Sequence, residues 1–285
     1  MKNLLSVCFF LLAASVGAQT DVTLFDHYIR SQGANIVQEF VSLLEIPNVA
    51  NDLPNINKNA RYIMGQLDQR GVSTQLLEHP GVPPIVFGYL ASKKATRTLA
   101  FYVHYDGQPV DKTRWKHDPW TPKMYDKSLA EGGREIPFPK EVGKIDPESC
   151  VYARSAGDDK GPIIGILTAI DAMQLEGVEP TSNFVFFFEG EEEAGSEHLR
   201  MYLEDHSELL EDIDLWMFCD GPIHQSRKPQ LVFGVRGVTG FEVTTYGSNR
   251  PLHSGHYGNW APVPGQSLSS LIASMKDENG NVAIE

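Results

Sequence analysis

The stretch NFVFFFEGEEEAGS, residues 183–196, decides how we expect this chain to fold. Its first six residues are almost all Val or Phe, which predicts a strand that is buried on both faces. Four carboxylates follow this strand at once, on Glu189, Glu191, Glu192 and Glu193. Carboxylates crowded at the edge of a core repel one another and are costly to bury unless cations neutralise them. The stretch therefore predicts a buried strand that ends at a cation site.

The segments around this stretch alternate between predicted strands and helices. Apolar runs predict strands at residues 85–90, 98–103 and 214–219, and helical spacing of apolar residues predicts helices at residues 34–46, 60–67, 161–174 and 196–204. Pro162 lies near the start of one of these helices, where proline is well tolerated. Alternating strands and helices are typical of an α/β fold, in which helices cover a central sheet.

Two further segments differ from this pattern. Residues 107–150 are rich in Pro, Gly, Lys and Asp and predict a long irregular excursion over the surface. Residues 239–246 alternate between apolar and polar, which predicts a half-exposed strand, and a helix is expected around residues 266–275. An Asn279-Gly280 turn signal follows. We therefore expect a second domain to begin near residue 238.

Composition excludes some classes of partner. Of the 285 residues, 41% are hydrophobic and 10% aromatic, which is ordinary for a soluble globular protein. The formal net charge of −13 argues against a protein that binds nucleic acid or anionic membranes, because both need basic patches.

The N-terminus predicts a signal peptide. A positive charge on Lys2 precedes a short apolar run at residues 4–14, and small residues lead to an expected cleavage point after Ala18. A membrane anchor is the alternative, but the apolar run is too short to span a bilayer comfortably. We expect residues 1–18 to be removed, leaving a secreted or periplasmic protein with no membrane attachment.

The cysteines do not form a disulfide framework. Loss of the signal peptide would remove Cys8 and leave Cys150 and Cys219. Two cysteines in a chain of this size are too few to hold the fold together, so stability must come from the core. Both are expected to be small buried side chains, and whether they pair is open.

Residues capable of metal binding gather where predicted strands end or helices begin. His104 and Asp106 follow one strand, Asp158 and Asp159 precede a helix, and Asp220 follows another strand. In open α/β sheets, sites form beyond the carboxyl ends of the strands, so these side chains are expected to converge with the Glu cluster. One imidazole among several carboxylates suits divalent metals, Zn²⁺ in particular. Asp106 would orient the imidazole of His104 from its far nitrogen.

Each of these features has a simpler interpretation when taken alone. Paired aspartates before a helix are often N-caps, and a run of Glu at a helix start is usually a solvated face. Asp220, before Gly221, would ordinarily be a turn residue. A calcium-binding surface is disfavoured because no loop has regularly spaced oxygen ligands. The shared position of the clusters at the sheet edge is what favours a metal site.

Three ordered motifs resemble a known family. They are HYDGQP at residues 104–109, YARSAGDDKG at residues 152–161 and EGEEEAGS at residues 189–196, with Asp220 and LHSG at residues 252–255 in support. They resemble the co-catalytic di-zinc peptidase family of carnosine-type dipeptidases, aminoacylases, glutamate carboxypeptidases and succinyl-diaminopimelate desuccinylase. The resemblance runs from about residue 37 to residue 285. It implies a three-layer α/β catalytic domain with a central mixed sheet at residues 19–237, and the first part of an α+β lid or dimerisation domain at residues 238–285.

The resemblance also implies a set of metal ligands. Asp158 would bridge two Zn²⁺ ions, with a cis peptide bond between Asp158 and Asp159. His104 and Asp220 would complete the protein ligands of one ion, and Glu193 would bind the other. Mn²⁺ or Co²⁺ could occupy such oxygen and nitrogen sites as well.

Catalytic roles follow from the same resemblance. Glu192 would be the general base that takes a proton from water and passes it to the leaving amine. Asp106 would support His104 from behind. His253 would reach into the site of a neighbouring subunit and stabilise the oxyanion, so a homodimer is expected for the full-length protein.

The predicted function is therefore that of an exported metal-dependent hydrolase. It would cleave peptide or N-acyl amide bonds of small substrates, and Asp220 in place of Glu favours the dipeptidase and aminopeptidase branches. The last histidine ligand of the family has no counterpart here, and the lid domain is incomplete, so the chain is expected to be C-terminally truncated. The alternative is a catalytically inactive remnant or binding protein that keeps the fold.

Overall fold

The computed structural model describes residues 22–140, 145–221, 223–226, 228 and 230–284. Its α-helices are α1 (Val22–Leu44), α2 (Leu53–Gln69), α3 (Lys160–Leu175), α4 (Leu199–Asp205), α5 (Ser254–Tyr257) and α6 (Pro264–Ser274). Its strands are β1 (Ser73–Leu77), β2 (Ile85–Leu90), β3 (Thr98–His104), β4 (Lys123–Tyr125), β5 (Glu135–Ile136), β6 (Cys150–Tyr152), β7 (Asn183–Glu189) and β8 (Leu215–Phe218).

The chain divides into two compact units, Met1–Pro222 and Ile223–Glu285. The expected signal peptide at residues 1–18 lies outside the described residues. Among the helices that the structure describes, none is long and apolar enough to cross a membrane. The expected domain boundary near residue 238 stays a prediction.

The first unit is built on a five-stranded mixed sheet in the order β1-β2-β7-β3-β8. β7, β3 and β8 run parallel to one another, whereas β2 is antiparallel to both β1 and β7. Each parallel connection passes through helical segments, as parallel strands require. The α/β class and the mixed sheet expected from the sequence are confirmed.

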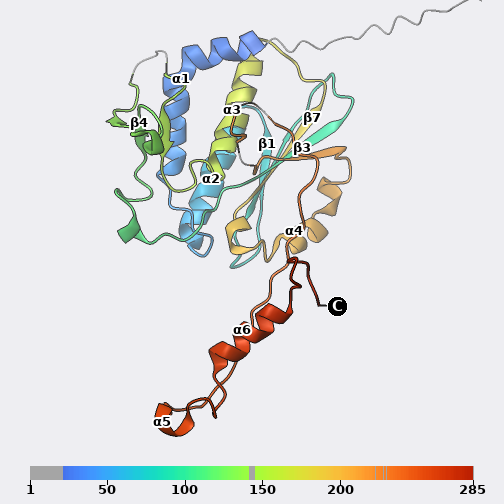
Figure 1. Ribbon diagram of the computed structural model, residues 1–285. Coiled ribbons are helices and arrows are strands. Elements are labelled where there is room, and N and C mark those ends of the chain that lie inside the picture. The colour runs from blue at the N-terminus through green and yellow to red at the C-terminus, as the bar shows by residue number, and fades with distance from the viewer. Residues whose placement is uncertain (1–21, 141–144, 222, 227, 229, 285) are drawn as a thin grey trace, which may run out of the picture. The chain divides into compact units, whose positions relative to one another are not determined.

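β7 is apolar between its end residues, Asn183 and Glu189, because helices cover both faces of the sheet. Phe186 and Phe188 pack into a cluster with residues of α1, α2 and α3. Phe187, which points to the opposite face, packs into a second cluster with Tyr202 of α4. Figure 1 shows α1, α2 and α3 on one side of the strands and α4 on the other. The sheet is therefore the middle layer of three.

Residues 107–150 are more ordered than the sequence predicted. They contribute β4 and β5, which pair with β6 in a three-stranded antiparallel sheet of order β5-β4-β6. Met124 and Tyr125 of β4 are buried, with exposed fractions of 5% and 3%. Most of the described residues of this segment have no regular structure and are exposed or half-buried, as predicted. The short strands were missed because they leave almost no periodic signal in a sequence rich in turn residues.

Two expected elements differ from the structure. The helix expected from residue 196 begins only at Leu199, because Gly195 (φ 94°) and Ser196 (φ 51°) have left-handed backbone conformations that an α-helix cannot include. Residues 239–246 alternate as expected but form no strand with any described segment. Alternation describes the two faces of a strand, whereas a strand also needs a neighbour to accept its backbone hydrogen bonds.

The remaining cysteines do not pair. Cys150 lies in β6 and Cys219 directly follows β8, and both are free and half-buried. The two belong to different sheets. The fold therefore depends on its packed core, as the sequence indicated.

Candidate metal centre

The candidate site lies where the three parallel strands end. His104 is the last residue of β3 and pairs in register with Glu189, the last residue of β7. Asp220 follows β8 closely, and Asp158 lies in the turn before α3. The Nε2 atom of His104 lies 2.8 Å from Asp158 Oδ1 and 3.8 Å from Asp220 Oδ2. Four separate segments thus converge at the carboxyl edge of the sheet, as expected for this class of fold.

His104 is buried and is contacted at both ring nitrogens. Its Nδ1 lies 3.2 Å from the carbonyl oxygen of Asp106 and 3.4 Å from Asp106 Oδ1. Its Nε2 faces Asp158, Asp220 and Glu192, whose Oε2 is 3.9 Å away. An imidazole that a carboxylate holds on one nitrogen, with the other directed at further carboxylates, is typical of a metal-binding histidine.

The electrostatics of the site favour positive charge. Burial by itself lowers the pKa of His104, but the hydrogen bond and charge of Asp106, with the charges of Asp159 and Asp158, outweigh it and raise the pKa to about 10. The surrounding carboxylates therefore stabilise a cation at Nε2. In a metal site, the metal ion takes the place of that proton.

Two overlapping sets of side chains have the spacing of metal ligands. His104, Asp158 and Glu193 form one set, and His104, Asp159 and Asp220 form the other, with one ligand atom of each residue within 4.8 Å of the others in its set. The donors are one imidazole nitrogen and several carboxylate oxygens, which suit Zn²⁺, Mn²⁺ or Co²⁺. The residues present therefore fit a divalent metal.

Asp159 is a candidate ligand that the sequence indicated only as capable of metal binding, without a ligand role of its own. The peptide bond between Asp158 and Asp159 is cis, and Asp159 is the N-cap residue of α3 without a capping hydrogen bond from its side chain. Instead, Asp159 Oδ2 accepts a hydrogen bond from the backbone N–H of His104 at 3.3 Å. Burial, with the charges of Asp220 and Asp158, raises the pKa of Asp159 to about 8 although His104 opposes it. A nearby cation would stabilise its ionised form.

Asp106 links the histidine to the Glu cluster. Its carboxylate is buried and accepts hydrogen bonds from the backbone N–H groups of Glu192 (3.1 Å) and Glu193 (3.0 Å). These bonds fix the start of the turn that carries both glutamates. Burial raises the pKa of Glu192, with a further contribution from Asp220 that His104 opposes. Glu192 is thus placed beside His104 with an increased affinity for a proton.

Gln108 is a second residue that sequence patterns did not reveal. Its Nε2 donates a hydrogen bond to Glu193 Oε2 at 2.6 Å. This bond restrains the carboxylate of Glu193 and leaves its other oxygen free for a ligand. Gln108 lies in the HYDGQP motif, but only the folded chain shows which carboxylate it contacts.

Glu189 and Glu191 are not the solvated charges that the sequence suggested. Glu189 is 1% exposed and accepts a hydrogen bond from the hydroxyl of Tyr102. Glu191 pairs with His198 through both carboxylate oxygens, at 2.9 Å and 3.0 Å. Glu191, Glu197 and His198 also have metal-ligand spacing, but both oxygens of Glu191 already contact His198, so we interpret the contact as a hydrogen-bonded pair.

His253 belongs to the second unit, Ile223–Glu285. It is exposed and is the N-cap residue of α5, where its Nδ1 accepts a hydrogen bond from the backbone N–H of Gly255 at 3.1 Å. Its ring lies 4.8 Å from that of His256. The role in oxyanion stabilisation stays a prediction.

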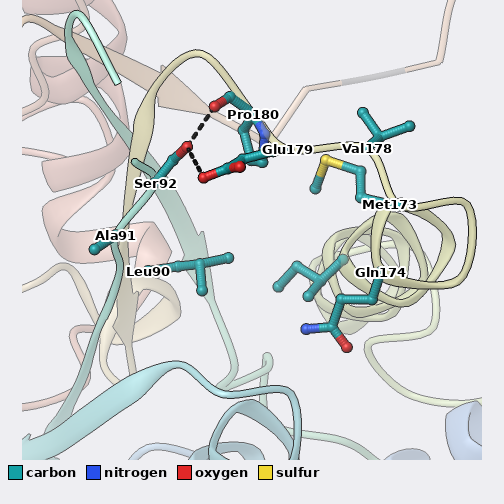
Figure 2. Close-up of a pocket in the computed structure, with 10 residues that line it drawn as sticks. Leu90, Ala91, Ser92, Met173, Gln174, Val178, Glu179 and Pro180 are labelled. Carbon is teal, nitrogen blue, oxygen red and sulfur yellow. Dashed lines mark hydrogen bonds between the residues drawn. The ribbon is translucent and has the colours of Figure 1, made fainter. Parts of the chain in front are cut away.

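An apolar pocket lies apart from this site (Figure 2). Leu90 at the end of β2 and Met173 of α3 line it, together with the segment that leads into β7. The hydroxyl of Ser92 donates to the carbonyl oxygen of Pro180 and to Glu179 Oε1 at its rim. Among the residues that line this pocket, Glu179 is the only charged one and none is a histidine. We therefore expect catalysis at the opposite end of the strands, in the candidate metal centre.

Comparison with known proteins decides the family. Residues 100–255, more than half of the 285-residue chain, match the model of peptidase family M20/M25/M40. The chain belongs to this family. The matched segment of this M20/M25/M40 chain contains every residue of the two ligand sets and also His253.

Curated relatives and a solved structure agree with this assignment. The Cys-Gly metallodipeptidase dug1 of Schizosaccharomyces pombe is 29% identical over 86% of this chain and 51% of its own length. The Beta-Ala-His dipeptidase of Mus musculus is 31% identical over 71% of this chain and 37% of its own. The structure of the M20 family metallo-carboxypeptidase Sso-CP2 from Sulfolobus solfataricus is 26% identical, with a TM-score of 0.64 over 88% of this chain and 52% of that one. The chain therefore spans about half the length of these relatives or less.

Proposed function

We propose that the full-length protein is a metal-dependent dipeptidase that hydrolyses the peptide bond of small substrates. The observation that carries this proposal is the position of His104 Nε2, which faces Asp158, Asp220 and Glu192 at 2.8–3.9 Å. Membership of the M20/M25/M40 peptidases supports it, as do the relatives named Cys-Gly and Beta-Ala-His dipeptidases. The acyl amide bond of an N-acyl amino acid is the second substrate type that such a site would accept.

Two Zn²⁺ ions would be held by the side chains of the two ligand sets, with Mn²⁺ or Co²⁺ as substitutes. The family resemblance assigns His104 and Asp220 to one ion, Glu193 to the other and Asp158 to both. In the structure, His104 is the residue that the two sets share. Bound metal would supply Lewis acidity that polarises the scissile carbonyl and lowers the pKa of water. Asp159, held against the backbone of His104, is available to the same ion as Asp220.

Glu192 would move the proton in this reaction. Its carboxylate is half-buried, and burial raises its pKa, so it is a stronger base than a solvated carboxylate. It would take a proton from the attacking water and give it to the leaving amine. His253 from a second copy of the chain would stabilise the negative charge on the carbonyl oxygen, so the active form would be a homodimer.

A substitution of Glu192 tests the proposal in the full-length gene product. We expect wild-type protein with bound Zn²⁺ to hydrolyse Cys-Gly or β-Ala-His, and we expect Glu192→Gln to lower kcat by about 10²–10⁴-fold while Zn²⁺ content is unchanged. Glu197→Gln, which changes an exposed carboxylate in the same segment, is the control and should retain activity. Full activity of Glu192→Gln would refute the base assignment. Absence of both metal and hydrolysis in the wild type would favour a non-catalytic protein that keeps the fold.

We also propose that the protein is exported, on the evidence of the Lys2 charge and the apolar run at residues 4–14. N-terminal sequencing of the mature protein is the direct measurement. The expected first residue is Gln19, and recovery of an intact Met1 terminus in the cytoplasm would overturn the proposal.

A further inference from the structure

A short segment that ends α1 and continues toward α2, residues 43–48, contacts both halves of the candidate metal centre. Four of its side chains are buried: Leu43, Leu44 and Asn48 have no exposed surface, and Ile46 is 5% exposed. Glu45 is exposed and Pro47 is half-buried. We call residues 43–48 the anchor segment. None of its residues is a metal ligand in either set, and no sequence motif singled it out.

Asn48 uses every polar group of its side chain. Its Nδ2 donates to the carbonyl oxygen of Tyr105 at 2.8 Å and to Ser155 Oγ at 2.9 Å. Its Oδ1 accepts a hydrogen bond from Trp120 Nε1 at 3.2 Å. The indole N–H can only donate and the carbonyl of Tyr105 can only accept, so one orientation of the amide satisfies all three partners. The backbone oxygen of Asn48 also accepts a bond from the N–H of Gly107.

Asn48 therefore holds the loop that follows β3 on both sides of Asp106. Tyr105 is bound before Asp106 and Gly107 after it. Asp106 in turn contacts His104 and the backbone of the turn that carries the glutamates. A shift of Asn48 would thus be transmitted directly to the imidazole side of the site.

Lys160 holds the other half of the site against the same segment. Its Nζ is completely buried and donates to the carbonyl oxygens of Leu43 and Ile46, both at 2.9 Å. Burial lowers the pKa of Lys160 well below its ordinary value, and both of these acceptors are neutral carbonyl oxygens at the point where α1 ends. The backbone N–H of Lys160 bonds to the carbonyl oxygen of Ser155 at 3.1 Å and closes the turn between them.

Asp158 and Asp159 lie inside that turn. Ser155 fastens the beginning of the turn to Asn48, and Lys160 fastens its end to Leu43 and Ile46. The anchor segment is therefore bonded to both ends of the turn that carries these aspartates, and also to the loop that carries Asp106. The anchor segment thus contacts both the turn that carries Asp158 and the loop that follows His104. The spacing between these two parts places Asp158 Oδ1 2.8 Å from His104 Nε2.

The space around these bonds is filled. A Cβ atom on Gly107 would lie 2.2 Å from Ser155 Oγ and 3.1 Å from Asn48 Nδ2. Ser155 has a positive φ of 62°, a conformation that costs a residue with a side chain more than it costs glycine. The absence of a side chain at Gly107 is therefore what allows the hydroxyl of Ser155 to reach Asn48.

We propose that Asn48 and Lys160 are positioning residues which, through the anchor segment, set the distance between His104 and the turn that carries Asp158 and Asp159. The ligand bound by these residues would be the divalent metal of the proposed function. The inference therefore rests on that proposed function. The hydrogen bonds of Ser155 and the empty side-chain position of Gly107 are parts of the same arrangement.

Co²⁺ titration of the metal-free, full-length protein tests this role, because the visible absorption of bound Co²⁺ reports its coordination. We expect Asn48→Ala to weaken Co²⁺ binding by about 10–100-fold and to change the absorption bands. Asn183→Ala is the matched control. Asn183 bonds to Ser92 and Thr98 at the opposite end of the strands, so its loss should leave the Co²⁺ spectrum unchanged.

A steric rescue gives a second, independent test. Gly107→Ala alone should displace Ser155 and weaken Co²⁺ binding. Gly107→Ala combined with Ser155→Gly removes the clash but also the hydrogen bond between Ser155 and Asn48, so it should restore Co²⁺ binding only in part. This pair keeps the proposal testable if Asn48→Ala does not fold. A role in stability alone would lower the unfolding midpoint of these variants without altering Co²⁺ binding by the folded protein.

The outcomes separate the two proposals. Wild-type affinity and spectrum in folded Asn48→Ala and Gly107→Ala, beside normal binding in the wild type, would overturn the positioning role alone. Failure of the wild-type protein to bind Co²⁺ would overturn the metal site and the positioning role with it. Weakened Co²⁺ binding in both variants, with partial rescue of Gly107→Ala by Ser155→Gly, would establish the role.

Discussion

The hydroxyl of Tyr102 donates a hydrogen bond to the carboxyl group of Glu189, and the bond joins the adjacent parallel strands β3 and β7 next to the candidate site. Both side chains are largely buried, with exposed fractions of 7% and 1%. Burial raises the pKa of Tyr102, so the hydroxyl stays protonated and acts as the donor. Burial also raises the pKa of Glu189, and the bond from Tyr102 opposes that change. The glutamate that begins the acidic cluster is thus a structural group.

Removal of this hydroxyl should destabilise the fold. Tyr102→Phe leaves a buried carboxyl group without its donor, and we expect a loss of about 1–3 kcal/mol in the free energy of unfolding. Tyr202→Phe is the matched comparison, because the hydroxyl of Tyr202 is also buried but bonds to a neutral carbonyl oxygen, that of Pro83. Urea unfolding of both variants measures the difference. Equal losses would show that the charge of Glu189 contributes nothing to its bond with Tyr102.

Asp106→Asn should impair both stability and metal binding. The amide cannot accept both backbone N–H bonds from Glu192 and Glu193, so we expect the free energy of unfolding to fall by about 3 kcal/mol. Zn²⁺ affinity should fall by about 10–100-fold because the imidazole of His104 loses its support. Asp111→Asn is the control, since exposed Asp111 also accepts a backbone bond, from Thr113. An Asp106 variant with wild-type Zn²⁺ affinity would contradict the prediction.

Two glycines should respond in opposite directions to substitution by alanine. A Cβ on Gly190 would lie 2.5 Å from the hydroxyl oxygen of Tyr105, whose buried ring cannot move easily, so Gly190→Ala is expected to cost about 1–3 kcal/mol. Gly165, inside α3, has nothing within 4 Å of the same position, and Gly165→Ala is expected to add about 0.5–1 kcal/mol. Thermal unfolding followed by circular dichroism distinguishes the two. Similar shifts in Tm would refute this account of the packing at Gly190.

The half-buried carboxyl group of Glu39 leads to a prediction about how stability depends on pH. Burial raises the pKa of Glu39 above its ordinary value of 4.5, although the ion pair with Arg70 opposes the shift. A raised pKa in the folded state means that this group stabilises the fold below pH 4.5, and that the stability is lost as pH rises through the folded pKa. Glu39→Gln cannot ionise, so its stability relative to the wild type should increase from about pH 4 to about pH 7.

Urea unfolding across this range measures the effect. Arg70 keeps its second partner, Asp171, at 2.7 Å in the Glu39 variant, so the helix contact is retained. A stability difference that is constant with pH would show that Glu39 ionises normally in the folded protein.

Much of the fold could be predicted from the sequence because a strand that is buried on both faces appears as a continuous apolar run. The continuous apolar run before Glu189 predicted β7, and helical spacing predicted α3 and parts of α1 and α2. The small sheet of β4, β5 and β6 was missed because its strands are only two or three residues long. The strand expected at residues 239–246 was overpredicted because alternation does not reveal whether a partner strand is present.

The sequence by itself determined that this chain forms an α/β sheet with His104, Asp158, Glu193 and Asp220 at strand ends and a helix start, because residue type and periodicity are local properties. The tertiary structure decided which carboxylates face the candidate metal site and which are buried and hydrogen-bonded to other parts of the chain. Asp159, Gln108, Glu189 and Asn48 owe their roles to bonds with residues far along the chain. Those bonds depend on strand register and on the contact between α1 and the turn before α3, which no local pattern contains.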